Sequence, residues 1–192
     1  KYYHAAATIC RDELKGLDEA VDYYNRALDS YFSEQARMNG QQLPGALKSF
    51  EAIDRILTTK RDWKAQERAY RDMIKRVKDG DEATFGKVRV GLFDALGEIY
   101  RSRLKHYQGA IGAFGVAQTM DPSSIDRSEK LAELYLVAGP DYLDKAVDQH
   151  MRMLRVEPFK YDSYKALGRI YMDAHQYDKR WCVCNTLAFL KK

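Results

Sequence analysis

Residues 93–122 read FDALGEIYRSRLKHYQGAIGAFGVAQTMDP, and this stretch decides the fold. It carries the pattern aromatic-x2-Leu-Gly-x2-Tyr, then Ala-x3-Phe, and it ends in Asp-Pro. Looser copies follow, in which Tyr135 and Tyr171 repeat Tyr100 at intervals of about 35 residues. One such unit cannot bury its own apolar face, so a chain with this period is predicted to stack its units into a solenoid.

Each copy is expected to be a pair of amphipathic helices, because its apolar positions recur at three and four residues. The small residues Gly97, Ala132 and Gly168 would let two helices approach closely, with Gly168 as a contact point. Pro122 and Pro158 should end second helices, since proline disfavours helix in the residue before it. The expected core consists of Phe50, Ile53, Leu57, Trp63, Tyr70, Phe93, Leu96, Tyr100, Phe114, Leu131, Tyr135, Leu167, Tyr171 and Trp181.

The pattern of aromatic residue, Leu-Gly, Tyr, Ala, aromatic residue and Pro resembles the tetratricopeptide repeat (TPR). The resemblance is strong in residues 17–32 and 90–192 and weaker in 44–77. It implies an all-α fold, a right-handed superhelical solenoid of about five antiparallel helix pairs. The pairs would form a single TPR-like domain over 1–192, with units at roughly 1–40, 44–78, 86–122, 125–158 and 161–192.

Three positions depart from the family pattern. Gln66 and Arg180 stand where a small Ala is expected, and Asp54 stands where Gly or Ala is usual.

The composition excludes several classes of protein. The chain has 192 residues, 45% of them hydrophobic, and a net charge of +4, which is too balanced to indicate nucleic acid as a partner. No apolar stretch approaches the roughly 18 residues that cross a bilayer, so a membrane partner is also disfavoured. The odd number of cysteines favours a reducing compartment and hence the cytoplasm. We expect the chain to be a piece of a longer protein, since no polar capping helix follows Leu190.

No catalytic signature is present, so we expect no enzyme activity and no cofactor. The sequence has no phosphate loop, no His-Glu-x-x-His and no Gly-x-Ser-x-Gly. Cys182 and Cys184 lie two apart on an expected helix and point to different faces, so they cannot share a metal, and we expect no metal site. Cys10 and Cys184 are interpreted as buried apolar residues.

The first helices of such a solenoid line its concave groove, and the resemblance implies a non-enzymatic scaffold that binds a protein or peptide segment there. Asp94/Glu98 and Glu129/Glu133 are like-charge pairs four residues apart, which cost an isolated helix about 0.2–0.5 kcal/mol each. Either ion pairs compensate them, or the groove has an acidic centre for a segment with Lys or Arg and a basic, Met-bearing end. The groove candidates are Arg55, Asp94, Glu98, Arg101, Glu129, Glu133, Lys165, Arg169 and Met172.

Chaperone-binding members of the family hold a C-terminal carboxylate with Lys and Asn on first helices. No Asn lies in the first-helix rows here, so a chaperone tail is disfavoured as the partner.

Two alternatives remain open. A basic face of one second helix, made of Lys64, Arg68, Arg71, Lys75 and Lys78, could bind polyanions, although a charge stripe is usually a solvated face. Unsatisfied terminal faces could instead pair two chains, with Leu187 and Leu190 buried between them.

Overall fold

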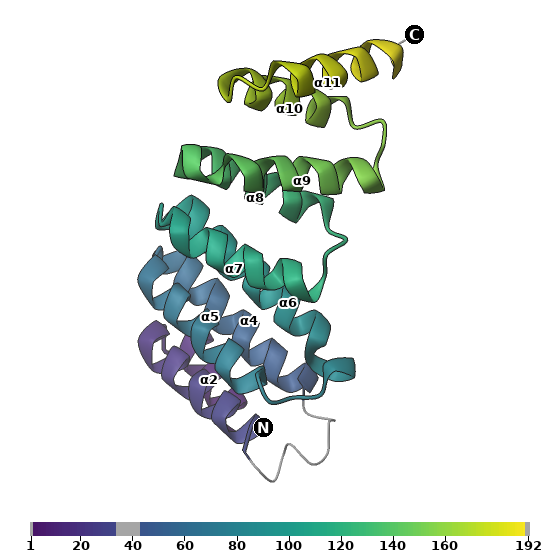
Figure 1. Ribbon diagram of the computed structural model, residues 1–192. Coiled ribbons are helices and arrows are strands. Elements are labelled where there is room, and N and C mark those ends of the chain that lie inside the picture. Colours follow the sequence, from purple (N-terminus) through teal and green to yellow (C-terminus); the bar gives the residue numbers. More distant parts are fainter. Residues whose placement is uncertain (1, 34–42, 191–192) are drawn as a thin grey trace. The chain divides into compact units, whose positions relative to one another are not determined.

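The described part of the chain, residues 2–33 and 43–190 of a computed structural model, contains helices and no strand. It divides into two compact units, the first ending at Leu104 and the second beginning at Lys105. The boundary falls between the two helices expected to form the third pair. Figure 1 labels the helices of both units.

The first unit contains α1 (Tyr2–Asp12), α2 (Leu17–Tyr31), α4 (Leu43–Lys60), α5 (Trp63–Val77) and α6 (Glu82–Glu98). A π-helical turn, Ile99–Arg103, follows α6 directly. Among these described helices, α1 packs on α2, α2 on α4, α4 on α5 and α5 on α6. The centre of this unit is formed by Ala7, Tyr24, Leu28, Ile53 and Met73, each at most 1% exposed.

The second unit contains α7 (Tyr107–Met120), α8 (Ile125–Ala138), α9 (Leu143–Val156), α10 (Tyr161–Asp173) and α11 (Tyr177–Leu190). A short 3₁₀ turn, Pro140–Tyr142, precedes α9. Each helix packs on the next one along the chain. Phe114, Leu131, Met153 and Leu167 are the large side chains fully buried in this unit.

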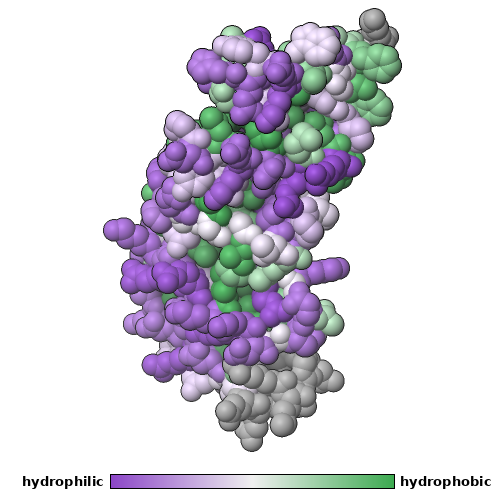
Figure 2. Space-filling model, in the orientation of Figure 1, coloured by the Kyte–Doolittle hydropathy of each residue, from purple (hydrophilic) through white to green (hydrophobic). Residues whose placement is uncertain are grey.

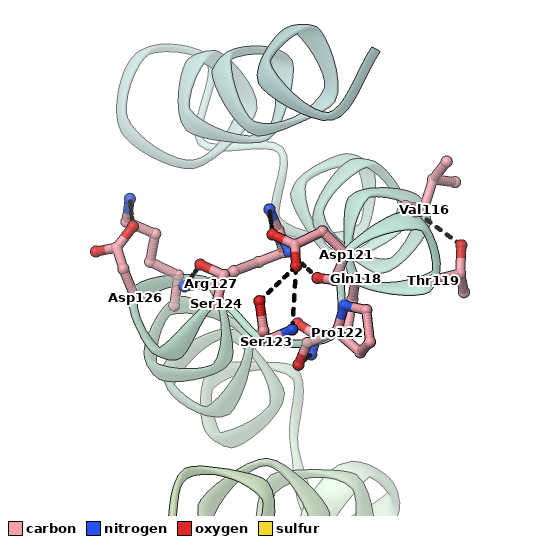
Figure 3. Close-up of polar contacts among 10 residues, drawn as sticks. Val116, Gln118, Thr119, Asp121, Pro122, Ser123, Ser124, Asp126 and Arg127 are labelled. Carbon is pink, nitrogen blue, oxygen red and sulfur yellow. Dashed lines mark hydrogen bonds and ion pairs between the residues drawn. The ribbon is translucent and has the colours of Figure 1, made fainter. Parts of the chain in front are cut away.

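The expected Asp-Pro stop of residues 121 and 122 lies directly after α7, as predicted, and the loop is held by polar contacts (Figure 3). Asp121 Oδ1 accepts hydrogen bonds from the Ser123 amide at 3.2 Å and hydroxyl at 2.6 Å, which lower the pKa of Asp121. The buried Arg127 donates to the Asp121 carbonyl and lies 3.5 Å from its carboxylate. Ser124 Oγ caps α8 by accepting from the Arg127 amide. These contacts satisfy the Asp121 carbonyl at the end of α7 and one amide in the first turn of α8.

Four helix-to-helix turns contain a residue other than glycine in the left-handed region, with φ between 53° and 57°: Lys15, Arg61, Lys105 and His175. The same turn geometry therefore recurs between the first and second helices of four pairs, which is independent evidence of a structural repeat.

Eight of the expected core residues are buried: Phe50, Ile53, Leu57, Leu96, Phe114, Leu131, Tyr135 and Leu167. Trp63, Tyr70, Phe93, Tyr100 and Tyr171 are only half-buried. Trp181 was wrongly assigned, because its side chain is 70% exposed. The half-buried face of α11 consists of Arg180, Val183, Leu187 and Leu190, and it continues to Gln176 just before the helix. Trp181 lies on the opposite side of the helix.

Candidate functional site

In the first unit, α1 and α4 are the first helices of their pairs. The side chains on their exposed faces line a pocket of about 300 Å³. The groove candidate Arg55 is on its wall, and the other lining residues are His4, Thr8, Arg11, Tyr24, Lys48, Glu51 and Ala52. Side chains one helical turn apart share a face, so the exposed rows of two neighbouring helices meet along this pocket.

The floor of this pocket is polar and internally bonded. His4 Nδ1 lies 2.8 Å from Ser49 Oγ, and Thr8 Oγ1 lies 3.2 Å from the Tyr24 hydroxyl. Burial, aided by the nearby charges of Arg11 and Lys48, lowers the pKa of His4. Arg11 is held by Asp12 at 2.6 Å. His4 therefore lies near two cations, Arg11 and Lys48, of which Arg11 is paired with Asp12.

The basic, Met-bearing end of the expected groove lies in the second unit and also lines a pocket. Lys165, Arg169 and Met172 project from α10 into a pocket of about 490 Å³ that α10 shares with α11. Its remaining lining residues are Tyr164, Gly168, Asp173, Arg180, Cys184 and Leu187. A second pocket of about 560 Å³ lies on the other flank of α10 and is lined by Leu136, Gly139, Pro140, Leu143, Ala166, Arg169, Ile170 and Asp173.

The acidic candidates are engaged in contacts within their own units. Glu98 pairs with Arg101, with both nitrogen–oxygen distances at 3.1 Å. Glu129 pairs with Lys160 at 2.6 Å, and this hydrogen bond raises the pKa of Lys160. Asp94 and Glu133 also take part in polar or electrostatic interactions. Asp94 and Glu98 belong to the first unit, and Glu129 and Glu133 belong to the second. Neither unit therefore brings all four carboxylates together.

The basic face of α5, Lys64, Arg68, Arg71, Lys75 and Lys78, is exposed along its whole length. Arg71 lies 3.3 Å from Glu67 and Lys75 lies 2.9 Å from Asp72. Glu67 also accepts a hydrogen bond from the Tyr100 hydroxyl at 2.6 Å, and burial together with this bond raises the pKa of Tyr100 to about 12. Two of the five cations are therefore already paired with carboxylates on the same helix.

The two departures from the family pattern in α4 and α5 bind each other. The buried Gln66 donates from Nε2 to Asp54 Oδ1 at 2.7 Å and to Thr58 Oγ1 at 3.0 Å. Burial, followed by the charge and hydrogen bond of Asp54, raises the pKa of Tyr70. The sequence shows each departure separately, and only the packing of α4 on α5 shows that they form one polar cluster.

The thiols differ from expectation at one position. Cys10 is buried as predicted, but Cys184 is exposed, as is Cys182. Cys184 lies on the flank of α11 that faces the pocket beside Gly168. A Cβ added at Gly168 would meet Cys184 Sγ at 3.8 Å, an ordinary van der Waals distance, so Gly168 is not the tight helix crossing that was expected.

Within the described ranges, no group of three His, Cys, Asp or Glu side chains is placed to hold a metal ion. No helix among those residues combines the length and the apolar composition needed to cross a membrane.

Comparison with solved structures shows the fold. YrrB, described as a TPR protein with an unusual peptide-binding site, aligns with a TM-score of 0.56 and 16% identity over 98% of this chain and 84% of its own. MamA from AMB-1 aligns with a TM-score of 0.60 and 12% identity over 99% of this chain and 90% of its own. PilF of Pseudomonas aeruginosa aligns with a TM-score of 0.50 and 15% identity over 98% and 74% of the two chains.

No family model and no curated protein sequence matches the chain. At these identities the likeness concerns the fold: the chain is an all-α solenoid of the TPR type, as the sequence predicted.

Proposed function

We propose that this protein is a non-enzymatic scaffold that binds extended protein segments in pockets along the exposed faces of the first helices of each unit. The observation that carries the proposal is that pockets lie along the expected first-helix rows in both units. Arg55 lines one in the first unit, and Lys165, Arg169 and Met172 line one in the second. Concave sites with apolar walls and a few convergent polar groups are the usual form of binding sites.

The charges in these pockets favour an acidic segment over a basic one. Arg55 and Arg169 have no carboxylate partner among the described residues, whereas Glu98 and Glu129 are ion-paired. Ion pairing accounts for Glu98 and Glu129, and Asp94 and Glu133 also take part in interactions. Among the described residues, Arg55 and Arg169 are therefore the groove candidates whose charge a ligand could pair with. YrrB, with the same fold, is described by its peptide-binding site, which supports a peptide as the ligand class.

Selection from a random peptide display library tests the proposal. Peptides selected on the full chain should lose binding to the double variant Arg55→Glu and Arg169→Glu. The matched control is Arg68→Glu, which reverses an exposed charge on the basic face of α5 and should leave peptide binding intact. Peptides that bind all variants equally, or binding lost only with Arg68→Glu, would overturn the proposal and favour the polyanion alternative.

A second candidate, assembly of two chains, is favoured by α11, but through other residues than the expected Leu187 and Leu190, which lie on its half-buried face. Trp181 and Phe189 are 70% and 75% exposed, and no residue of this helix is buried. Figure 2 shows hydrophobic surface close to the end of the chain where α11 lies. Light scattering over a range of concentrations should show a dimer that Trp181→Lys and Phe189→Lys abolish; a monomer at all concentrations would exclude it.

The location in the cytoplasm stays a proposal and rests on the three free thiols.

A further inference from the structure

Two pockets lie on adjacent flanks of α10, and one ridge separates them. The pocket toward α11 takes Tyr164, Lys165, Gly168 and Met172 from α10, and the pocket toward α8 and α9 takes Ala166 and Ile170. Arg169 and Asp173 line both pockets. These two residues are one helical turn apart, so they form the ridge between the pockets.

Each pocket has an exposed apolar side chain that a ligand could cover. Leu136, in the pocket toward α8, is 43% exposed, and Met172, in the pocket toward α11, is 42% exposed. Leu143 and Ile170 extend the apolar lining of the first pocket, and Tyr164 and Leu187 extend that of the second. Large exposed apolar side chains grouped in concave sites mark interaction surfaces more than isolated ones do.

The ridge carries one cation, Arg169, and one carboxylate, Asp173. Arg169 makes no ion pair with any described carboxylate, although Asp173 shares the ridge with it. Lys165 is held by Asp162 at 2.9 Å, and Arg180 donates to the Met172 sulfur, which draws its guanidinium toward α10. A guanidinium binds a carboxylate through two parallel hydrogen bonds, so Arg169 is suited to an acidic group placed over the ridge.

We propose that the α10 ridge binds an extended partner segment of the form apolar-x-acidic-x-apolar, with its Asp or Glu on Arg169 and one apolar side chain in each flanking pocket. This inference rests on the proposed scaffold function and specifies its ligand. A helix with its side chains is about 10–12 Å across, and an extended chain rises about 3.3 Å per residue. Apolar residues four apart therefore span about 13 Å, and because side chains alternate, they and the acidic residue between them face the same side.

The test uses synthetic peptides with blocked ends and fluorescence anisotropy on the full chain. A Leu-Ala-Glu-Ala-Leu core should bind, whereas Leu-Glu-Ala-Ala-Leu, of the same composition with the acid out of register, should bind at least tenfold more weakly. Arg169→Gln should weaken the first peptide by roughly tenfold, as expected for losing a charge-assisted hydrogen bond. Asp173→Asn should strengthen it, because a like charge is removed from the ridge.

The control is Arg152→Gln, an exposed cation of α9 that lines neither pocket and should not alter binding. A third peptide, Ala-Ala-Leu with a free C-terminal carboxylate, separates a terminal carboxylate from an acidic side chain as the recognised group. Equal affinity for the two registers, preference for the free terminus, or an unaltered affinity of Arg169→Gln would overturn the inference. If peptides selected from the library depend on Arg55 and Arg169 but lack the pattern, the scaffold function stands and this ligand is wrong.

Discussion

The helix pairs α4–α5 and α10–α11 accommodate the same kind of departure in opposite ways. Each has a large polar side chain where the TPR pattern has Ala, Gln66 in α5 and Arg180 in α11. Across from Gln66 stands Asp54, and the two bury their polar atoms against each other. Across from Arg180 stands Gly168, which offers no partner, and Arg180 stays half-buried on the wall of a pocket.

The difference shows what decides between a closed and an open helix pair. A buried polar group must be hydrogen-bonded, and Gln66 meets that condition through Asp54 and Thr58. A guanidinium without a buried acceptor remains hydrated. Arg180 therefore keeps the space between α10 and α11 open to solvent, whereas an Ala at this position would let the two helices pack closely. A large polar residue at this position is thus bonded inside the α4–α5 pair, whereas in the α10–α11 pair it borders a pocket of about 490 Å³.

The largest effect on stability is expected for Gln66→Ala. Removal of Nε2 takes one donor from the half-buried Asp54 carboxylate, which keeps its hydrogen bond with Tyr70, and a lost hydrogen bond to a charged group costs about 1.5–3 kcal/mol. Urea unfolding followed by circular dichroism measures the loss. A decrease below about 0.5 kcal/mol would show that Asp54 is adequately hydrated and that α4–α5 is as open as α10–α11.

A double-mutant cycle should show that Asp54 and Gln66 act as a unit. The variant Asp54→Ala with Gln66→Ala restores two small residues, so its cost should fall short of the sum of the single costs by about 0.5–3 kcal/mol. Strictly additive costs would contradict the coupling. The same cycle on Gly168→Ala and Arg180→Ala should give an interaction energy near zero, because a Cβ at position 168 would have no atom of Arg180 within 4 Å.

Gly168→Ala should raise the stability of the α10–α11 pair by up to about 1 kcal/mol. Glycine inside a helix is less favourable than alanine by about this amount, and the new Cβ would have ordinary contact with Cys184 Sγ at 3.8 Å. Thermal melting provides the measurement. A lower melting temperature would restore the original expectation of a tight crossing at Gly168.

Arg180→Ala should change stability by less than about 0.5 kcal/mol, since the side chain is partly exposed and pairs with no described carboxylate. The same urea titration, with Arg152→Ala as the matched control on α9, tests this. A loss above 1 kcal/mol would mean that Arg180 supports the packing of α10 on α11 as Gln66 supports α4 on α5.

Much of the fold could be predicted from the sequence, because its signals are local. Helical spacing of apolar residues and the Asp-Pro after Met120 depend on neighbours along the chain, and α7 ends where they indicate. The turns at Lys15 and Arg61 could not be predicted, because no glycine or asparagine marks their positive φ. The π-helical turn at Ile99–Arg103 has no sequence signal either.

The pockets of the candidate site were predictable in part. The exposed rows on first helices follow from helical spacing, and Arg55, Arg169 and Met172 line pockets. Trp181 was misplaced because its size indicates burial, whereas the face of α11 that contacts α10 is the row through Arg180 and Leu187. The pocket beside Gly168 requires the pairing of two helices, which a single sequence does not reveal.

The bonded pair Asp54–Gln66 also constrains how this lineage could have changed. From an ancestor with two small residues, acquiring Asp54 first would have placed a carboxylate in the interface without its amide donor. The Tyr70 hydroxyl would then have been its remaining partner, whereas Gln66 acquired first would have had Thr58 Oγ1, 3.0 Å from Nε2, as an acceptor. Once both are present, reverting either one is costly, so the two positions are expected to vary together among homologues. Small residues at both positions are therefore not required for this repeat, since its helices pack as a pair around a polar contact.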